Sequence, residues 1–444
     1  MRTKSPPGPK GHWLSGNLPE FRRDRLGFLT HCARAYGDIV KLRLGPRRMI
    51  LVNHPDLVEE VLVTRNRHFI KHFALRMTQT TLGNGLLTSE GEFWRRQRRL
   101  AQPAFHRDRI AGYAAVMVEY AERMLAGWAD GQVRDVHDDM MRVTLEVVAK
   151  TLFDADISGD SADASAAMET LMRCFTARVG RIIRLPERFP TPVNLRLRRA
   201  ARRLDQILFR IIAERRAGGE DRGDLLSMLL HAQDEDDVRM TDHQLRDEAM
   251  TLFMAGHETT ADTLTWAWYL LSQDPEVEAR LHAELAEVLG GRAPGVADLP
   301  RLAYTEHVVT ETLRLYPTVW LLGREAIEPC EVGGYRVPVG TTVYMSQWVL
   351  HRDARFFDDP ESYRPERWAD GLAQRLPRYA YFPFGGGPRI CIGNGFAMME
   401  SVLLLATIAQ RFRLALAPGA MIKPLPTMTL RPDGGIKMVL AQRC

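Results

Sequence analysis

Residues 384–393 read Phe384-Gly385-Gly386-Gly387-Pro388-Arg389-Ile390-Cys391-Ile392-Gly393, a glycine-rich loop with one cysteine near its end. Three consecutive glycines permit positive φ angles and a close approach of the backbone to a neighbouring group. A helix is predicted to begin just after Cys391, and the dipole at its amino terminus would stabilise a negative sulfur. The loop is therefore predicted to press against a flat ligand and to present one thiolate. The alternative is a buried, inert cysteine, which is the commoner kind.

Paired charges lie upstream of this loop. Glu311 and Arg314 are three residues apart, a spacing that puts a carboxylate and a guanidinium on one face of a helix. Alone this indicates little, because a solvated pair stabilises a helix by only about 0.2 to 0.5 kcal/mol. About fifty residues later, the segment Arg364–Trp368 contains Arg367, which could join Arg314 as a second partner of Glu311. Further upstream, Trp94 and Arg98 stand four apart, so one helix face could give an indole N–H and a guanidinium to the same carboxylate.

The longest predicted helix runs from Asp242 to Gln273. Thr241 and Gln244 form a capping box in front of it, and a proline at residue 275 ends it. Its middle reads Ala255-Gly256-His257-Glu258-Thr259-Thr260, and a glycine in a helix interior costs about 1 kcal/mol relative to alanine. We therefore expect a local fault in the helix where the backbone yields to a ligand. A threonine-rich packing notch is the alternative.

These motifs resemble those of the cytochrome P450 family of haem-thiolate monooxygenases, and the likeness extends from the Pro-rich start through Met428. The matched patterns are F-x-x-G-x-R-x-C-x-G, E-x-x-R, W-x-x-x-R and A-G-x-[DE]-T-T. The cysteine loop and W-x-x-x-R are similar to the branch with fatty-acid and microsomal enzymes. The resemblance implies a mainly α fold with small β-sheets and a long central helix crossing the haem. It also implies a single domain over residues 1–444, with the segment 1–20 packed on it and no reductase domain.

The resemblance implies a haem b cofactor whose iron takes the Cys391 thiolate as axial ligand, which favours O–O cleavage. Phe384 would pack beside the sulfur, and Glu311, Arg314 and Arg367 would form a buried structural triad. The remaining haem-binding residues implied are Trp94, Arg98, Arg324 and Arg389 at the propionates, with Gly385, Gly393 and Ala255.

On the oxygen side, the resemblance assigns Thr259 to holding bound oxygen and its water, and Glu258 to relaying protons from solvent. His257 occupies a variable position of the pattern and is expected to be an accessory polar residue, not a metal ligand. The substrate-pocket residues implied are Leu82, Leu86, Leu87, Ala255, Thr318, Val319, Trp320, Leu321 and Met428. These side chains are mainly apolar, so we expect a hydrophobic substrate, with fatty acids, terpenoids and steroids all open.

Composition excludes several other classes. The 444 residues are 45% hydrophobic and 26% charged, which rules out a disordered, collagenous or coiled-coil chain. A formal charge of +5 is too small to indicate nucleic-acid binding. The five cysteines never stand in a C-x-x-C spacing, which favours a reducing cytoplasm. No run of about 20 apolar residues predicts a membrane anchor.

Electrons are expected to come from a separate protein, because no flavin or iron–sulfur pattern follows the cysteine loop. An acidic ferredoxin or flavodoxin, with its reductase, would suit a basic proximal face formed by Arg95, Arg96, Arg98, Arg99, Arg375, Arg378 and Arg389. We therefore predict a monooxygenase that inserts one atom of O2 into a small hydrophobic molecule. The alternatives are a peroxide-driven peroxygenase or haem isomerase, and a non-catalytic haem-binding protein.

The expected helices span residues 92–100, 108–129, 139–153, 162–180, 195–216, 242–273, 276–289, 302–316 and 396–412. Strands are expected at 39–44, 49–52, 335–337 and 342–346, the first two as a hairpin, with a further hairpin around 433–435.

Overall fold

The computed structural model describes residues 5–157, 159–179, 189–218, 222, 224–231 and 240–443. Its contacts divide the chain into two compact units, and each unit combines two segments that are distant in sequence. The first unit comprises residues 1–76 and 310–391, and the second comprises residues 77–309 and 392–444. The single domain expected over residues 1–444 remains a prediction.

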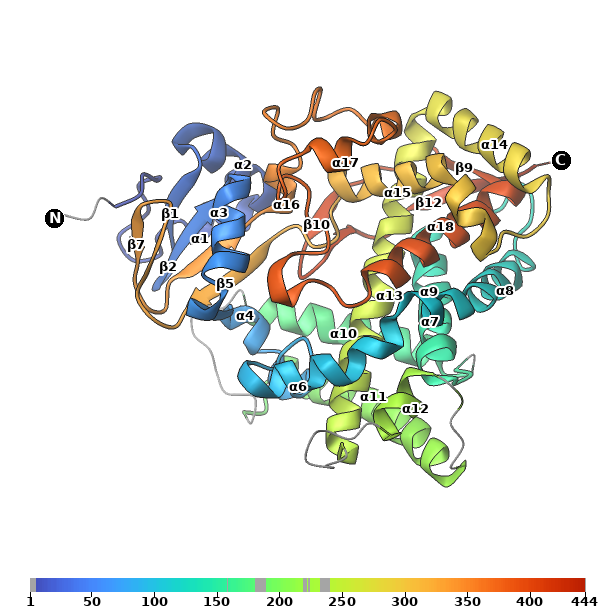
Figure 1. The fold of residues 1–444 in the computed structure, drawn as a ribbon, viewed down its shortest axis with the longest axis horizontal. Helices are drawn as coiled ribbons and strands as arrows, with labels where there is room; N and C mark the ends of the chain where they lie inside the picture. The colour runs from blue at the N-terminus through green and yellow to red at the C-terminus, as the bar shows by residue number, and fades with distance from the viewer. Residues whose placement is uncertain are drawn as a thin grey trace. The chain divides into compact units, whose positions relative to one another are not determined.

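The first unit is built on a mixed five-stranded sheet with the order β1-β2-β8-β5-β3 (Figure 1). β1 (Ile39–Leu44) and β2 (Arg47–Val52) form the predicted hairpin around Gly45, whose φ of 63° requires glycine. β2 pairs in parallel with β8 (Thr342–Met345). β5 (Leu322–Ala326) runs antiparallel to β8 and to β3 (Phe69–Lys71).

The core of the first unit consists of apolar side chains from this sheet and from the segments that follow β2 and β8. Its buried members include Val52, Val58, Val61, Leu62, Val343, Met345, Leu350, Tyr379 and Phe382. The Pro-rich start of the chain runs along β1: the Lys41 N–H donates to the Pro7 carbonyl oxygen at 2.7 Å, and the Asn17 N–H donates to the Arg43 carbonyl oxygen at 2.6 Å. The start of the chain is therefore attached to β1 at Pro7 and Asn17.

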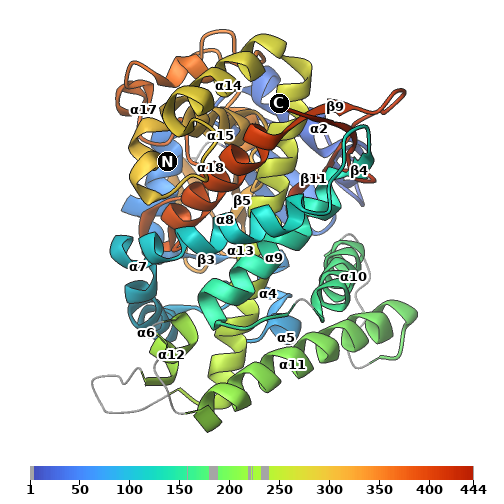
Figure 2. The ribbon, with the colours of Figure 1, turned by 90° about the vertical axis from the view of Figure 1, so that its right-hand side faces the viewer.

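The second unit is mainly helical, and α13 (Asp242–Gln273) has the predicted bounds (Figures 1 and 2). The predicted capping box is confirmed, because the Gln244 N–H donates to the Thr241 hydroxyl at 3.2 Å and the Thr241 N–H donates to the Gln244 side chain at 2.8 Å. α9 (Val136–Phe153) packs along α13, with Phe153 edge-on to Phe253. α18 (Asn394–Arg411) packs against α8 (Ala114–Leu125) and α13.

Two small sheets complete the second unit. One has the strand order β4-β12-β9, from Val133–Asp135, Lys437–Gln442 and Phe412–Leu416. The other pairs β10 (Pro424–Pro426) with β11 (Leu430–Pro432). The indole N–H of Trp266 on α13 donates to the Leu430 carbonyl oxygen at 2.8 Å, which attaches the β10–β11 hairpin to the long helix.

The other elements are mostly short. In the first unit they are α1 (Leu18–Arg23), α2 (Arg25–Tyr36), α3 (Pro55–Glu59), η1 (Glu60–Thr64), η2 (Asn66–His68), α4 (Phe73–Arg76), β6 (Cys330–Val332), β7 (Tyr335–Val337), α16 (Gln347–Leu350), η5 (Pro365–Trp368), α17 (Leu372–Arg375) and η6 (Gly387–Arg389). In the second unit they are α5 (Gln79–Leu82), α6 (Gly91–Ala101), η3 (Gln102–Phe105), α7 (Arg107–Gly112), α10 (Ser161–Val179), α11 (Pro192–Gly218), α12 (Leu225–His231), α14 (Pro275–Leu289) and η4 (Val296–Arg301). The residues of α15 (Ala303–Leu315) are divided between the units.

Two sequence predictions are wrong. The helix expected over 108–129 is two helices, because α7 ends at Gly112, a poor helix former, and α8 begins at Ala114. The strands beside Gly434 and Gly435 do not pair with each other as a hairpin. β11 pairs with β10, whereas β12 pairs with β4 and β9. The partners of β11 and β12 are determined by contacts with strands that are distant in sequence, and a local turn signal does not encode those contacts.

Within the part of the chain that the structure describes, no helix combines the length and apolar character needed to cross a membrane.

Candidate active site

The cysteine loop is fixed by backbone hydrogen bonds within the first unit. The Cys391 N–H donates to the Phe384 carbonyl oxygen at 3.0 Å, and the Gly385 N–H donates to the Phe382 carbonyl oxygen at 2.9 Å. The phenol of Tyr379 accepts the Gly387 N–H at 3.2 Å. Phe384, which was predicted to pack beside the sulfur, thus closes the loop through its backbone.

Glycine is favoured for different physical reasons at the three consecutive positions of the loop. A Cβ on Gly387, whose φ is 65°, would lie 2.0 Å from the Leu62 carbonyl oxygen, and one on Gly386 would lie 2.2 Å from the Tyr379 ring. Gly385 has a φ of 72° and meets its nearest neighbour only at 3.9 Å. Gly386 and Gly387 therefore allow the loop to pack on its own unit, whereas at Gly385 glycine is favoured by the positive φ alone.

Cys391 is the exposed one among the four cysteines that the structure describes. Cys32 and Cys174 are buried and Cys330 is half-buried. Burial raises the pKa of the Cys32 thiol to about 11 and also raises the pKa of Cys330. A thiolate that can reach an iron atom needs access and a polar setting. The donor atom and its exposure at Cys391 therefore fit a haem-iron ligand.

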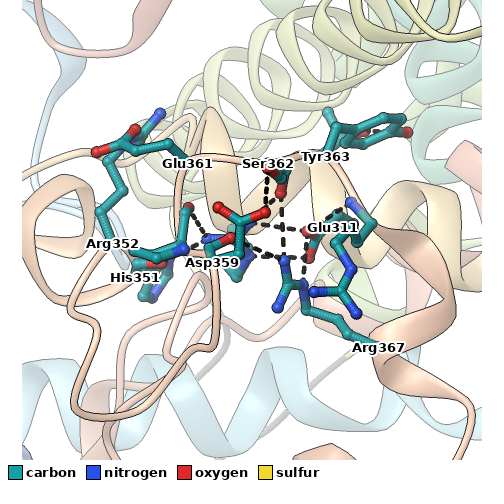
Figure 3. Close-up of polar contacts among 12 residues, drawn as sticks. Glu311, His351, Arg352, Asp359, Glu361, Ser362, Tyr363 and Arg367 are labelled. Atoms are coloured by element: carbon teal, nitrogen blue, oxygen red, sulfur yellow. Dashed lines mark hydrogen bonds and ion pairs between the residues drawn. The ribbon is translucent and has the colours of Figure 1, made fainter.

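The Glu311 carboxylate accepts hydrogen bonds from several donors in the first unit (Figure 3). Arg314 donates to both of its oxygens at 2.8 Å, and Arg367 donates through Nε at 2.8 Å. The Trp368 indole and the Arg364 backbone N–H donate at 2.9 and 3.0 Å. The side chains of Glu311 and Arg314 are fully buried, and that of Arg367 is 5% exposed. The structure thus brings the three predicted triad residues together and adds Trp368.

The network continues to the cysteine loop through His351. Arg314 donates to the His351 carbonyl oxygen at 2.8 Å and to the Ser362 carbonyl oxygen at 3.0 Å. Burial, with the charges of Arg314 and Arg352, lowers the pKa of His351 to about 3, so its ring is neutral. Its Nε2 accepts the Phe382 N–H at 3.0 Å. One chain of hydrogen bonds therefore joins the triad to the segment that carries Cys391.

The four residues predicted to bind the haem propionates lie on three segments. Trp94 and Arg98 are half-buried one turn apart on α6, where the Arg98 Nε donates to Gln102 at 2.9 Å. Arg324 is buried on β5 and donates to the Gly323 carbonyl oxygen at 3.1 Å. Arg389 is half-buried in the cysteine loop. The first pair belongs to the second unit, and Arg324 and Arg389 belong to the first.

One window on α13 remains accessible. Every side chain from Glu248 to Trp268 is buried except at Ala255, Gly256 and Thr259. Ala255 and Thr259 are four residues apart, so they share one face of the helix. These small residues leave room for a ligand at the position where the sequence predicted one.

The predicted fault in α13 is absent, because the helix is continuous across this window. The Thr259 hydroxyl donates to the Ala255 carbonyl oxygen at 2.9 Å, and the Thr260 hydroxyl donates to the Gly256 carbonyl oxygen at 3.2 Å. Such bonds add a donor to helix carbonyls without breaking the ladder. Gly256 instead permits close packing, since a Cβ there would lie 3.0 Å from Val148 of α9.

Glu258 lies in a buried acidic cluster. Its Oε1 accepts the Thr429 hydroxyl at 2.7 Å, and burial together with the Asp262 carboxylate raises its pKa to about 7. Asp262 is fully buried and lies 3.2 Å from the Nε2 of His137. His257 points elsewhere: its Nδ1 lies 2.9 Å from the Phe253 carbonyl oxygen, and burial lowers its pKa to about 4. Glu258 is therefore a carboxyl that can both hold and release a proton near neutral pH.

The predicted pocket residues are mostly buried or half-buried. Leu82 and Leu86 are buried on either side of a turn that α13 fastens: Asp247 accepts the Asn84 N–H at 2.7 Å, and Glu248 accepts the Leu86 N–H at 2.9 Å. Leu87, Val319, Leu321 and Met428 are half-buried, Thr318 and Trp320 are buried, and Ala255 is exposed. Met428 lies in the turn between β10 and β11, one residue before the partner of Glu258.

Comparison with known proteins decides the family. A sequence model of the cytochrome P450 family matches residues 6–440. The chain belongs to the cytochrome P450 family. Cyclooctatin synthase of Streptomyces melanosporofaciens is 42% identical, over 99% of this chain and 98% of that protein. Cyclooctat-9-en-7-ol 5-monooxygenase of the same organism is 40% identical, over 94% and 93% of the two chains, and pentalenene oxygenase of Streptomyces avermitilis is 36% identical, over 96% and 95%.

Membership of this family gives the general chemistry. Cytochromes P450 bind haem through an axial cysteine thiolate and use O2, hydrophobic substrates and redox partners. This P450 is a monooxygenase. The sequence motifs did not indicate the groups that surround Glu258, namely His137, Asp262 and Thr429. The hydrophobic pattern places Asp262 on a helix and His137 two residues before one, but nothing in either segment indicates that they meet.

The triad makes a stability prediction. Arg314→Ala leaves the buried Glu311 carboxylate without its main partner, which costs roughly 3 to 5 kcal/mol of unfolding free energy. We expect a lower Tm and a lower yield of haem-loaded protein, measured by thermal unfolding and by haem content per chain. Arg123→Ala is the control, because Arg123 forms an exposed pair with Glu119 that is worth less than about 1 kcal/mol. A parental Tm in Arg314→Ala would show that the network does not support the fold.

The loop glycines make a second prediction. Gly387→Ala introduces both an unfavourable positive φ, worth about 1 to 2 kcal/mol, and a clash with the Leu62 carbonyl oxygen. Gly434→Ala carries the same backbone penalty at a φ of 81° but has no atom within 4 Å. We expect Gly387→Ala to lose more stability than Gly434→Ala and to lose haem as well, measured by Tm and haem content. Equal losses in the two variants would contradict the loop packing.

Proposed function

We propose that this P450 hydroxylates a cyclic terpenoid, with Cys391 as the sulfur ligand of the haem iron. The observation that carries the proposal is an exposed cysteine at the end of a loop whose backbone is held by hydrogen bonds on both sides. Under this proposal the propionates are bound by Trp94, Arg98, Arg324 and Arg389, and the haem also contacts Phe384, Gly385, Gly393 and Ala255. The haem, when bound, supplies the activation of O2.

The overall reaction fixes what the protein residues must deliver. One oxygen atom of O2 enters a C–H bond of the substrate to give an alcohol, and the other leaves as water with two protons and two electrons. The electrons come from a reduced partner protein, and the protons must come from solvent through the protein. Thr259, at the accessible window of α13, holds and orients the proton donor at the oxygen site. Glu258 supplies the protons, because its raised pKa lets it carry one near neutral pH.

The substrate class rests on the relatives and on the predicted pocket. Two relatives are named for oxidation of cyclooctat-9-en-7-ol and of pentalenene, and they align over nearly their whole length. The predicted pocket residues are apolar except Thr318, which suits a hydrocarbon skeleton better than a charged head group. Among the three classes left open by the sequence, these points support a terpenoid over a fatty acid or a steroid.

The electron donor proposed is a ferredoxin or flavodoxin with its reductase. Arg375 and Arg378 are exposed near the cysteine loop in sequence, and Arg95 and Arg99 are exposed on α6. Positive charge on either segment favours an acidic partner and speeds its association. Some of this charge is offset locally, since Arg378 pairs with Glu59 at 3.1 Å and Arg95 pairs with Glu92. A cytoplasmic location remains a prediction from cysteine usage.

Cys391→Ser tests the ligand. A serine hydroxyl is a weak donor that does not ionise near neutral pH, so the reduced carbon monoxide complex should lose the red-shifted band of thiolate-ligated haem. Cys330→Ser, which changes the half-buried thiol elsewhere in the same unit, should keep that band. A red-shifted band that survives in Cys391→Ser would assign the ligand to another residue.

Thr259→Ala tests proton management. The variant keeps helix propensity, so folding and haem content should change little, while product formed per NADPH falls several-fold and hydrogen peroxide accounts for the lost electrons. Thr259→Ser should restore the parental ratio because it restores the hydroxyl. Thr260 is a poor control, because its hydroxyl faces the buried Glu400, whose pKa burial raises well above its usual range.

Thr265→Ala is the better control, since Thr265 makes the same type of bond on the same helix, to the Ala261 carbonyl oxygen at 2.7 Å. An unchanged ratio in Thr259→Ala would place the proton donor elsewhere. Turnover with hydrogen peroxide in place of NADPH and partner separates the alternatives: a peroxygenase would form product at parental rates only from peroxide, and a non-catalytic haem protein would form none from either.

A further inference from the structure

We propose that Asp262 and His137 extend the proton route from Glu258 to the protein surface. In this route His137 takes a proton from solvent and passes it to Asp262, and Thr429 connects Asp262 with Glu258. The inference rests on the proposed role of Glu258 and adds two positioning residues that no sequence motif indicated. Each step moves one proton between heteroatoms and no electrons, and His137 is reprotonated by water.

The four groups of this route lie close together within the second unit. The Nε2 of His137 on α9 lies 3.2 Å from an oxygen of Asp262 on α13. Asp262 follows Glu258 by four residues, so the two carboxyls share a face of the helix. The Thr429 hydroxyl donates to the Glu258 Oε1 at 2.7 Å, and Thr429 lies close enough to Asp262 to lower the pKa of that carboxyl. A hydroxyl that can donate and accept is suited to pass a proton between two acids.

The exposure of the side chains to solvent increases from Asp262 to His137, as a proton relay to the surface requires. The side chain of Asp262 is 0% exposed and that of His137 is 13% exposed, so the imidazole is the one member with access to solvent. The second oxygen of Asp262, Oδ2, is buried and has no hydrogen-bond partner among the residues that the structure describes. A buried carboxylate oxygen without a donor is costly, and the cost falls when the group carries a proton. Asp262 is therefore placed to receive a proton, and not only to hold His137.

The charges around the path favour a shared proton. Burial raises the pKa of both Glu258 and Asp262, and the Asp262 carboxylate further raises the pKa of Glu258. Burial by itself lowers the pKa of His137. The hydrogen bond and charge of Asp262, together with the charges of Asp135 and Asp138, outweigh burial, so the pKa of the imidazole is raised. Arg431 on β11 lowers the pKa of both acids and limits the shift. The positive His137 in turn lowers the pKa of His257, which stays neutral.

A purely structural ion pair between α9 and α13 is the competing explanation. It predicts that loss of either partner lowers Tm and leaves the fate of electrons unchanged. A relay predicts a change in product per NADPH at constant haem content, and a pH profile that follows His137. Because the imidazole must be protonated to donate, the product ratio of the parental enzyme should fall as the pH rises through the pKa of His137.

The test compares Asp262→Asn and His137→Gln with Asp139→Asn in the haem-loaded enzyme with a surrogate ferredoxin and reductase. Asp139 is buried on the same helix as His137 and pairs with Arg134 at 2.6 Å, so its variant breaks an ion pair outside the path. We expect the first two variants to lose product per NADPH several-fold and to lose the pH dependence of that ratio. Asp139→Asn should lower Tm and keep both.

A second readout does not depend on turnover. NMR titration of the histidine rings in the resting ferric protein should give a His137 pKa above the ordinary value of about 6.5, and Asp262→Asn should shift it downward. Parental ratios and pH profiles in both variants would overturn the proposal, and so would a His137 pKa below the ordinary value. If Asp262→Asn fails to fold, His137→Gln and the titration of the parental protein decide. Uncoupling in Thr259→Ala without uncoupling in His137→Gln and Asp262→Asn would reject this route alone and leave the proposed function standing.

Discussion

The buried carboxylate of Glu311 is the constraint on which the cysteine side of the protein depends. A carboxylate without access to water must be paired and fully hydrogen-bonded, and Arg314, Arg367, Trp368 and the Arg364 backbone meet that need together. Because the same Arg314 also binds the His351 carbonyl, and the neutral His351 accepts the Phe382 N–H, satisfying one charge fixes the start of the cysteine loop. The position of the Cys391 loop thus depends on the need to pair the buried Glu311 charge, although Glu311 is not itself part of the loop.

The buried acids of the long helix α13 differ from Glu311, because they can gain or lose a proton near groups that exchange protons. Glu258 and Asp262 are both acids whose pKa is raised by burial, and each lies beside a group that can give or take a proton. Such a cluster costs stability, since raised acid pKa values favour folding at low pH and that contribution is lost as the pH rises through them. A cluster retained inside a helix at that cost is typical of a functional site.

The sequence predicted those features that local patterns encode. The bounds of α13 followed from its caps, the thiol of Cys391 from a ten-residue loop, and the Glu311 partners from two short motifs. The interruption between α7 and α8 at Tyr113, and the placement of β11 and β12 in different sheets, were not predicted. Both depend on packing and pairing with residues that are distant in sequence. The same reason applies to His137 and Asp262, which meet across 125 residues, and to Thr429 and Glu258, which meet across 171. Gly256 was assigned to ligand access, whereas its missing side chain makes room for Val148.

We propose above all that this backbone presents the Cys391 sulfur to the haem iron. X-ray absorption at the iron edge of the purified parental protein measures the atoms bound to the metal without any substitution. We expect one sulfur scatterer in the first coordination shell, in addition to the four nitrogens of the haem. A first shell fitted by nitrogen and oxygen alone would contradict it.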